Sequence, residues 1–271
     1  MDIRQIHADL IPIIQDDLAV LGMAYPVDEV GYIYERLSEL FQALSICHLL
    51  EGLDTESFRE NLVRSGFARQ FFLRKSFESG NTKDRRLAIS RTEAFLDALV
   101  SGYTPLWAGI DRFQPKKWHP DWEYEDDFAY FLFLHVLSVR SSEASASPNL
   151  KPVLDRFEVS LEGEKTPRFQ ICQSLLDKDP SGFQDALHQL MDEIEEKYEA
   201  KKARLLEPDP SQLVLWARSF VSIEGLALLR MAELMGMEVE EAFALCPPSA
   251  RLSQAAKPFV DVFTELDAVL D

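Results

Sequence analysis

The chain has 271 residues, of which 46% are hydrophobic, so it can bury a substantial core and is not disordered as a whole. Asp and Glu number 46 whereas Lys and Arg number 28, which gives a formal net charge of -18. This charge argues against binding of nucleic acid or an anionic membrane through a basic surface, and it favours basic protein partners.

No part of the sequence approaches the roughly 20 consecutive apolar residues that a membrane-spanning helix needs. The first five residues, Met-Asp-Ile-Arg-Gln, lack the basic start and the apolar stretch of a secretory signal peptide. We therefore expect a soluble, cytoplasmic protein. Cys47, Cys172 and Cys246 stand far apart without a CxxC motif, so we expect reduced core residues rather than a redox or metal site.

Apolar residues recur every three or four positions along most of the chain, and only 11 residues are glycine. This pattern predicts an all-α fold, a multi-helix bundle of antiparallel helices that forms a single helical domain over residues 1–271. Four helices are predicted in the first half. They run from Ile3 to about Tyr25, from Val30 to Gly52, from an N-cap at Asp54 to Gly80, and from Thr82 to about Trp107.

Pro115 and Pro120 disfavour a continuous helix between them, so this segment is predicted to be a loop. The helix that follows should begin near Asp127 and be buried, because it is apolar on nearly every side. The segment 141–149 is rich in small polar residues, as linkers are. It divides the chain into halves 1–140 and 150–271, although a loop inside one domain fits the same composition.

Two helices of the second half are predicted to begin with the same device, an aspartate N-cap followed by proline, at Asp179-Pro180 and Asp209-Pro210. The helix from Pro210 to Met235 has few charges, and we expect it at the centre of this half with Trp216 in the core.

The sequence contains no catalytic or nucleotide-binding motif of the GxSxG, GxGxxG or P-loop kind. Asp185, His188 and Asp192 share one helical face, but a single histidine without a second such motif indicates an exposed polar face rather than a metal site. We therefore predict that the protein is not an enzyme and needs neither a cofactor nor a metal.

Residues 52–117 are locally basic and include Lys83, Arg85, Arg86 and Arg91. These residues could bind phosphate groups. Since the whole chain is strongly acidic, we favour a solvated helix face whose cations pair with carboxylates of the same protein.

The most distinctive candidate surface is residues 118–127, which we call the acidic aromatic segment. Five of its last seven residues are carboxylates, and it also contains two tryptophans and a tyrosine. Aromatic anchors among charged residues are typical of tight protein interfaces. The residues predicted to bind a partner are Trp118, Asp121, Trp122, Glu123, Tyr124, Glu125 and Asp126.

A second interpretation of the acidic aromatic segment is purely structural. Trp118 and Trp122 would pack the loop onto the core, and the acids would supply the negative first turn of the next helix. If the segment is an interface, carboxylates at this density imitate the phosphates of nucleic acid, so the cationic groove of a nuclease is a natural target.

Several pieces of residues 120–252 together resemble immunity protein family 49 of bacterial polymorphic-toxin systems. They are the acidic entry into an aromatic helix at Tyr124 to Leu137, the short helix around Cys172 to Asp179, the segment Phe183 to Leu187, and Phe220 to Arg230. The resemblance implies a cytoplasmic, non-enzymatic helical protein that binds and neutralises a cognate toxin. It supplies no binding residues that can be carried over to this sequence.

A different class of function, a helical-repeat scaffold that presents a groove to peptides, would also suit a helical chain. We find no 34-residue period of the tetratricopeptide kind to favour it. Genome context would distinguish the two functions, because an immunity gene is expected directly downstream of the gene for a large secreted toxin.

Overall fold

The computed structural model describes residues 2–23, 25–91, 93–142, 149–204, 212–240, 242–251 and residue 263. Within these ranges the chain forms helices and no strand, which confirms the predicted all-α fold. The α-helices are α1 Ile3–Leu21, α2 Val27–Gly52, α3 Thr55–Glu78, α4 Glu93–Ser101, α5 Thr104–Phe113, α6 Glu125–Ser142, α7 Lys151–Ser160, α8 Pro167–Asp177, α9 Pro180–Lys202, α10 Leu213–Arg218 and α11 Ile223–Leu234.

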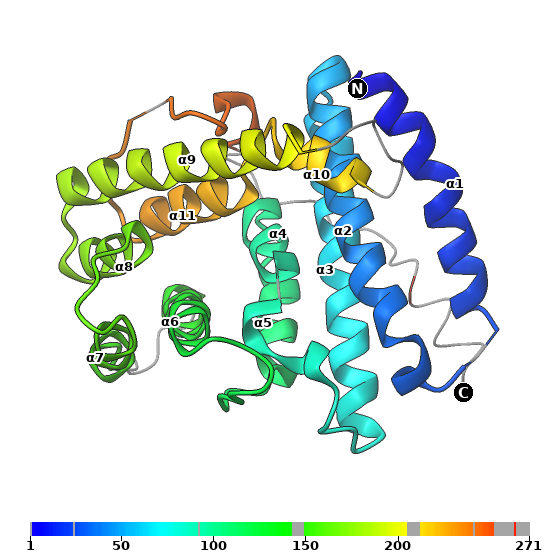
Figure 1. Ribbon diagram of the computed structural model, residues 1–271, viewed down its shortest axis with the longest axis horizontal. Coiled ribbons are helices and arrows are strands. Elements are labelled where there is room, and N and C mark those ends of the chain that lie inside the picture. Colours follow the sequence, from blue (N-terminus) through cyan, green and yellow to red (C-terminus); the bar gives the residue numbers. More distant parts are fainter. Residues whose placement is uncertain are drawn as a thin grey trace.

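The first three helices lie side by side as antiparallel neighbours, with α2 packed against both α1 and α3 (Figure 1). Because α2 has neighbours on two sides, it buries residues around most of its circumference. The predicted N-cap of α3 is confirmed, since the side chain of Asp54 accepts a hydrogen bond from the Ser57 backbone N–H at 3.0 Å.

The predicted helix from Thr82 to Trp107 is wrong. Two short 3₁₀ turns, Arg85–Leu87 and Ile89–Arg91, precede α4, and α4 ends at Ser101, just before Gly102, whose φ of +73° suits glycine. Arg69 of α3 is buried and donates hydrogen bonds to the backbone carbonyls of Arg86 at 2.5 Å and Ala88 at 3.1 Å. The Arg69 guanidinium therefore holds residues 85–91 against α3 in two 3₁₀ turns, and not in a continuous α-helix.

The aromatic helix α6 is buried as the sequence predicts, and it begins at Glu125, two residues before the expected start. Its His135 side chain is fully buried, stacks on Phe95 with ring centroids 3.6 Å apart, and places Nδ1 3.1 Å from an Asp111 carboxylate oxygen. Burial lowers the pKa of His135 in spite of this carboxylate, so the imidazole is a neutral part of the core.

The helix predicted from Pro210 to Met235 is two helices, α10 and α11. The Ser222 hydroxyl caps α11 by accepting a hydrogen bond from the Gly225 N–H at 3.1 Å. A second helix therefore begins at Ile223, so α10 does not continue into α11. α11 is largely buried and packs against α4, but Trp216 on α10 is only half-buried, so its predicted place in the core is wrong. Asp209-Pro210 lies outside the described residues.

Asp179 stands at the predicted N-cap position of α9, although its side chain makes no capping hydrogen bond. All three cysteines are buried and free, as the sequence predicts.

Helices from the two sequence halves pack on one another, α11 against α4 and α10 against α2. In Figure 1, α6 and α7 are seen almost along their axes, so they cross the direction of α2 and α3 instead of continuing the antiparallel array. Residues 143–148, inside the predicted linker, lie outside the described residues, and the single domain with a division at 141–149 stays a prediction. No described helix is long and apolar enough to span a membrane.

Candidate partner-binding groove

The acidic aromatic segment folds against the core through its tryptophans. Trp118 and Trp122 are half-buried and pack on the hydrophobic core. The Trp118 indole N–H donates to the Glu123 backbone carbonyl at 3.2 Å, and the Trp122 ring stacks on His119 with centroids 4.0 Å apart. Both rings therefore fix the path of the segment, whatever else they contact.

Glu123 points inward from the same segment. This residue is 9% exposed, and its carboxylate accepts a hydrogen bond from the Ser90 backbone N–H at 2.9 Å. Burial raises the pKa of Glu123, and the hydrogen bond from Ser90 only partly opposes this effect. Glu123 thus ties the segment to the second 3₁₀ turn, and its carboxylate is already occupied.

The outward side of the segment consists of other predicted residues. Tyr124 is 80% exposed, a large fraction for an aromatic side chain, and Asp121 is also exposed. Glu125 forms a half-exposed ion pair with Arg156 at 2.7 Å. Asp126 is half-buried in the first turn of α6. The structure therefore brings an exposed tyrosine and carboxylates together at the loop and the helix start.

This loop forms one wall of a cavity of about 430 Å³. The opposite wall is the second 3₁₀ turn, which contributes Ser90 and Arg91. The described residues around the cavity are Ser90, Arg91, Pro120, Asp121, Trp122, Glu123, Tyr124 and Asp127. Among these described residues Arg91 is the one cation, against three carboxylates.

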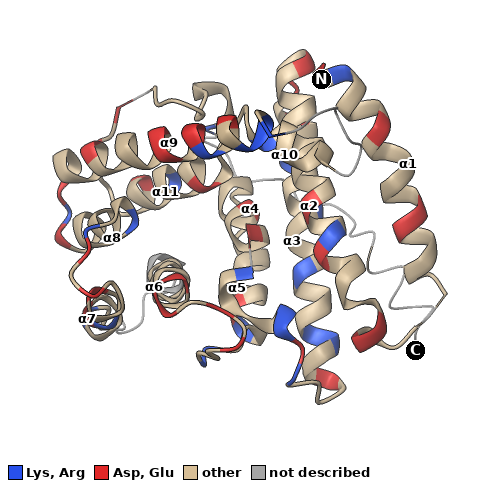
Figure 2. Cartoon of the chain, in the orientation of Figure 1, with Lys and Arg blue, Asp and Glu red and all other residues tan. Residues whose placement is uncertain are grey.

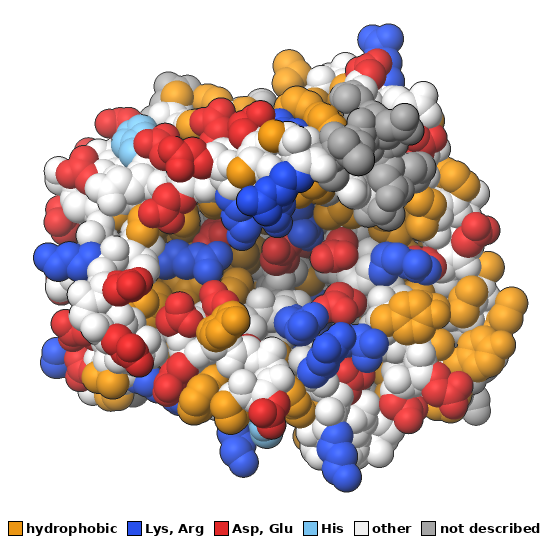
Figure 3. All heavy atoms as spheres, viewed as in Figure 1, with side chains coloured by type: hydrophobic (Ala, Val, Ile, Leu, Met, Phe, Trp, Pro, Cys, Tyr) orange, Lys and Arg blue, Asp and Glu red, His pale blue; other side chains and the backbone are white. Residues whose placement is uncertain are grey.

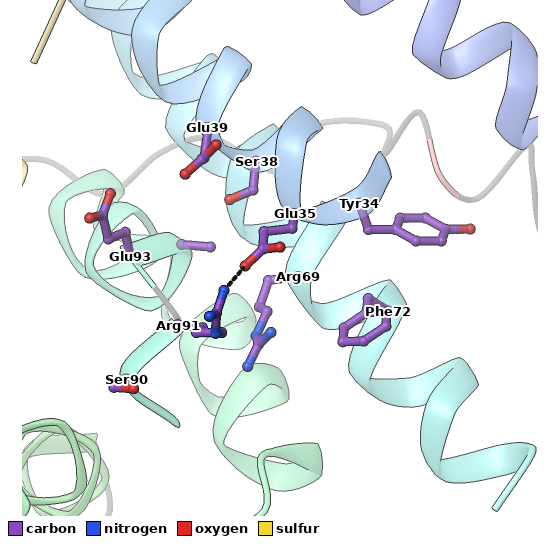
Figure 4. Close-up of a pocket in the computed structure, with 10 residues that line it drawn as sticks. Tyr34, Glu35, Ser38, Glu39, Arg69, Phe72, Ser90, Arg91 and Glu93 are labelled. Carbon is purple, nitrogen blue, oxygen red and sulfur yellow. Dashed lines mark hydrogen bonds and ion pairs between the residues drawn. The ribbon is translucent and has the colours of Figure 1, made fainter. Parts of the chain in front are cut away.

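A second cavity, of about 180 Å³, shares Ser90 and Arg91 with the first. Three glutamates line it, Glu35 and Glu39 from α2 and Glu93 from the start of α4, as Figure 4 shows. Arg91 pairs with Glu35 at 3.3 Å across this cavity. We call the two adjoining cavities together the acidic groove.

The negative charge of Glu39 is less well compensated by neighbouring cations or hydrogen bonds than that of the other glutamates of the acidic groove. Its carboxylate lies 3.8 Å from Arg218, while Arg218 contacts Glu93 much more closely. Burial raises the pKa of Glu39, and the neighbouring Glu93 and Glu35 raise it further, although Arg218 acts in the opposite direction.

A third cavity, of about 300 Å³, continues from Ser90, Glu93 and Asp127 toward α9 and α11. Arg168 of α8 lies on its wall and binds both Glu224 carboxylate oxygens, at 2.8 and 3.0 Å, and also Asp127 at 3.0 Å. Burial alone would raise the pKa of Glu224, but the Arg168 guanidinium and a hydrogen bond from Tyr130 lower it overall. This cluster joins α6, α8 and α11 through one guanidinium that is shared between two carboxylates.

A buried polar network supports the groove from below. Arg218 of α10 donates to the side-chain carbonyl of Gln42, whose amide donates to the fully buried Asp97 carboxylate at 2.7 Å. Asp97 also accepts a hydrogen bond from the Ser65 hydroxyl. Burial raises the pKa of Asp97 to about 7, since neither of these donors is itself a cation.

The face shown in Figure 3 is hollowed at its centre, with acidic and basic side chains around the hollow. Acidic residues are spread over most of the helices, whereas Lys and Arg gather at the carboxyl end of α9 and along α3 (Figure 2). Arg86 and Arg91 pair with Glu35 at 3.7 and 3.3 Å, so these two cations pair within the protein, as the sequence favours. They do so from two 3₁₀ turns, not from a regular helix face.

The histidine on α9 has a different surrounding. His188 is exposed, and its Nε2 lies 3.4 Å from a carboxylate oxygen of Glu240. Over the described ranges, no group of three His, Cys, Asp or Glu side chains could hold a metal ion.

Sequence reasoning missed most of the groove and its surroundings. Glu35, Glu39, Glu93, Arg168 and Glu224 come from four helices far apart in the chain. The signal for the first two was their spacing of four on one helix, which is common on any solvated face. The many carboxylates of residues 118–127 indicate one wall of the larger cavity. They give no sign of the opposite wall, which is formed by Ser90 and Arg91.

The chain matches the family described as Immunity protein 49 over residues 53–250. The match begins well before residue 120, where the resemblance in the sequence is first apparent, and so includes α3 to α5 and the second 3₁₀ turn. No curated protein and no solved structure shows significant similarity to the chain. Because the match covers most of the chain, this protein belongs to the immunity protein 49 family.

Proposed function

We propose that this protein binds a cognate bacterial toxin and neutralises it by occluding the toxin's active site in the cytoplasm. The observation that carries the proposal is Tyr124, an 80% exposed aromatic side chain between carboxylates, in a member of an immunity family. An exposed tyrosine surrounded by charge is a typical interface anchor, because it contributes large contact area at small entropic cost.

The outward residues of the acidic aromatic segment are the proposed contact surface. Tyr124 is the anchor, and Asp121, Glu125 and Asp126 face cationic side chains of the toxin. Trp118, Trp122 and Glu123 support the surface from behind through the core contacts and the hydrogen bond to Ser90. Of the seven residues, four therefore contact the toxin and three hold the contact surface in place.

The net charge of -18 favours a basic toxin, and a nuclease is the class whose active site is ordinarily cationic. On this proposal the protein acts by binding alone, without a cofactor and without contact to nucleic acid or membrane.

The test is protection of a bacterial cell from the toxin encoded directly upstream of this gene. Cells that express the toxin domain should survive when they also express this chain, and purified toxin and chain should form a stoichiometric complex. Survival should fall with Tyr124→Ala and remain with Val159→Ala, an equally exposed apolar residue on α7. Failure of the wild-type chain to bind or protect would contradict the proposed function.

A further inference from the structure

The acidic groove has the shape of a seat for a protruding chain segment. Ser90 and Arg91 line both of its cavities, so the two cavities adjoin, with Tyr124 in the lining of the larger and Glu39 in the lining of the smaller. The cavity of about 430 Å³ is lined mainly by polar groups, unlike the mostly apolar pockets that hold small molecules, whereas the lining of the 180 Å³ cavity mixes charged and apolar side chains.

The charges along the groove select the chemistry of its occupant. Six carboxylates line the two cavities among the described residues, and they are Glu35, Glu39, Glu93, Asp121, Glu123 and Asp127. The cations in the same lining are Arg69 and Arg91. Arg69 donates to backbone carbonyls and to Gln114, so its hydrogen bonds serve the fold. The described groove therefore presents an excess of negative charge to whatever enters it.

Neighbouring cations outside the lining compensate this excess only in part. Arg168 pairs with Asp127, and Arg218 pairs closely with Glu93, but Glu39 is left with Arg218 at 3.8 Å. Burial raises the pKa of Glu39, Glu123 and Asp127, although Arg218, the Ser90 N–H and Arg168 respectively oppose this effect, so ionisation of each carboxylate is less favourable than in water. A cation from a bound partner would favour the ionised form of a nearby carboxylate such as Glu39.

The walls also suit a guanidinium group. Trp122 and Tyr124 form one side of the larger cavity, and the Tyr124 side chain is 80% exposed. Aromatic faces attract planar cations, and arginine combines this contact with paired hydrogen bonds to carboxylates.

We propose that the acidic groove receives an arginine-bearing loop of the toxin, with Glu39 and Asp121 as acceptors and the exposed ring of Tyr124 as the aromatic wall. This inference rests on the proposed function and names the chemistry of the segment that enters. Arg91 stands where the two cavities meet, so it repels the incoming cation and sets the affinity of the groove.

The test uses a blocked pentapeptide, acetyl-Gly-Arg-Gly-Arg-Gly-amide, and needs no toxin. Nuclear magnetic resonance titration should show saturable binding to the wild-type chain, with shifts at Ser90 and Tyr124. The same peptide with citrulline in place of arginine is the neutral control and should not bind. Glu39→Gln should weaken binding by about fivefold, the scale of one partly exposed ion pair.

Two further variants make the result specific. Arg91→Gln should tighten binding by a similar factor, because it removes the competing cation. Asp16→Asn removes one exposed negative charge on α1, which contributes no residue to the groove lining, and should leave binding unchanged. Melting temperatures of all variants establish that each is folded.

Absence of saturable binding to the arginine peptide, or equal losses in Glu39→Gln and Asp16→Asn, would overturn the groove as an arginine seat. Protection from the toxin that still depends on Tyr124 would then leave the proposed function standing. Loss of protection by the wild-type chain would instead remove the function while the peptide result stood by itself.

Discussion

The carboxylate of Glu123 and the backbone N–H of Ser90 are joined by a 2.9 Å hydrogen bond that closes the acidic aromatic segment onto the second 3₁₀ turn. The two residues lie 33 positions apart, and both line the larger cavity. The geometry of the candidate surface therefore depends on one inward-facing acid as much as on the outward-facing ones.

Glu123→Ala should lower the free energy of unfolding by about 1 to 3 kcal/mol, since it leaves the half-buried Ser90 N–H without its acceptor. Glu123→Gln keeps an oxygen acceptor and removes the buried charge, so it should cost less than the alanine variant. Urea denaturation of both variants measures the difference. Equal costs would mean that the charge, not the hydrogen bond, matters at this position.

Asp97 should make stability depend on pH near neutrality. Its pKa in the folded protein is about 7, above its ordinary value of 3.8, so between these pH values the folded state binds a proton that the unfolded state has released. The stabilisation is complete below the ordinary pKa and is lost as pH rises through the folded one. The variant Asp97→Asn keeps an oxygen that can accept from Gln42 but has no proton to release, so it should lack this loss.

Denaturation of the wild type and of Asp97→Asn at about pH 5 and about pH 8 checks this sign. The wild type should lose stability relative to the variant on going to the higher pH. A parallel response of the two proteins would show that Asp97 stays ionised in the fold.

Tyr124→Ala should weaken toxin binding by about 2 kcal/mol, mainly through faster dissociation, and leave the melting temperature almost unchanged, because the side chain is 80% exposed.

Trp122→Ala should lower the melting temperature, since its ring packs on the core and on His119. Measuring the toxin affinity of the same Trp122 variant distinguishes a role in toxin contact from a role in packing the loop on the core. A destabilised protein with wild-type affinity would show that this tryptophan only holds the loop.

Phe133→Ala should cost about 3 to 5 kcal/mol of unfolding free energy, as expected for a large aromatic side chain that is fully buried. Trp216→Ala should cost clearly less, because Trp216 is half-buried on the short helix α10. Chemical denaturation of both proteins tests the ranking, and the reverse order would place the core nearer α10 than the structure does.

Association with the toxin should slow as salt rises. The net charge of -18 attracts a basic partner from beyond contact distance, and this attraction is screened when the Debye length falls below about 5 Å. Stopped-flow association rates between about 50 and about 500 mM salt measure the effect. A flat rate would exclude electrostatic steering.

Local patterns were sufficient for the helices whose ends carry their own signals. Asp54 predicted the start of α3 because an N-cap acts within a few residues, and the apolar circumference of α6 predicted its burial. The predicted helix across Gly102 failed because the apolar period continues through the break, while the turn itself depends on one glycine and on Pro105.

The groove depends on contacts that no local pattern reveals. Residues 118–127 were identified from composition, but the inward turn of Glu123 depends on the Ser90 N–H from the other wall. The 3₁₀ path of residues 85–91 depends in turn on Arg69, a cation that the sequence places on an ordinary helix. Such arrangements follow from tertiary packing.

The hydrogen bond from Arg218 to Gln42 joins residues 176 positions apart. During synthesis, Gln42, Ser65 and Asp97 leave the ribosome long before Arg218 is made, so their polar network stays open until about four fifths of the chain has been translated. A transcript truncated between the codons for α9 and α10 would encode the helices around Asp97 but not Arg218, whose guanidinium completes the network. On the proposed function, resistance to the toxin would begin only after α10 has been translated, and chains that end before α10 would contribute nothing to it.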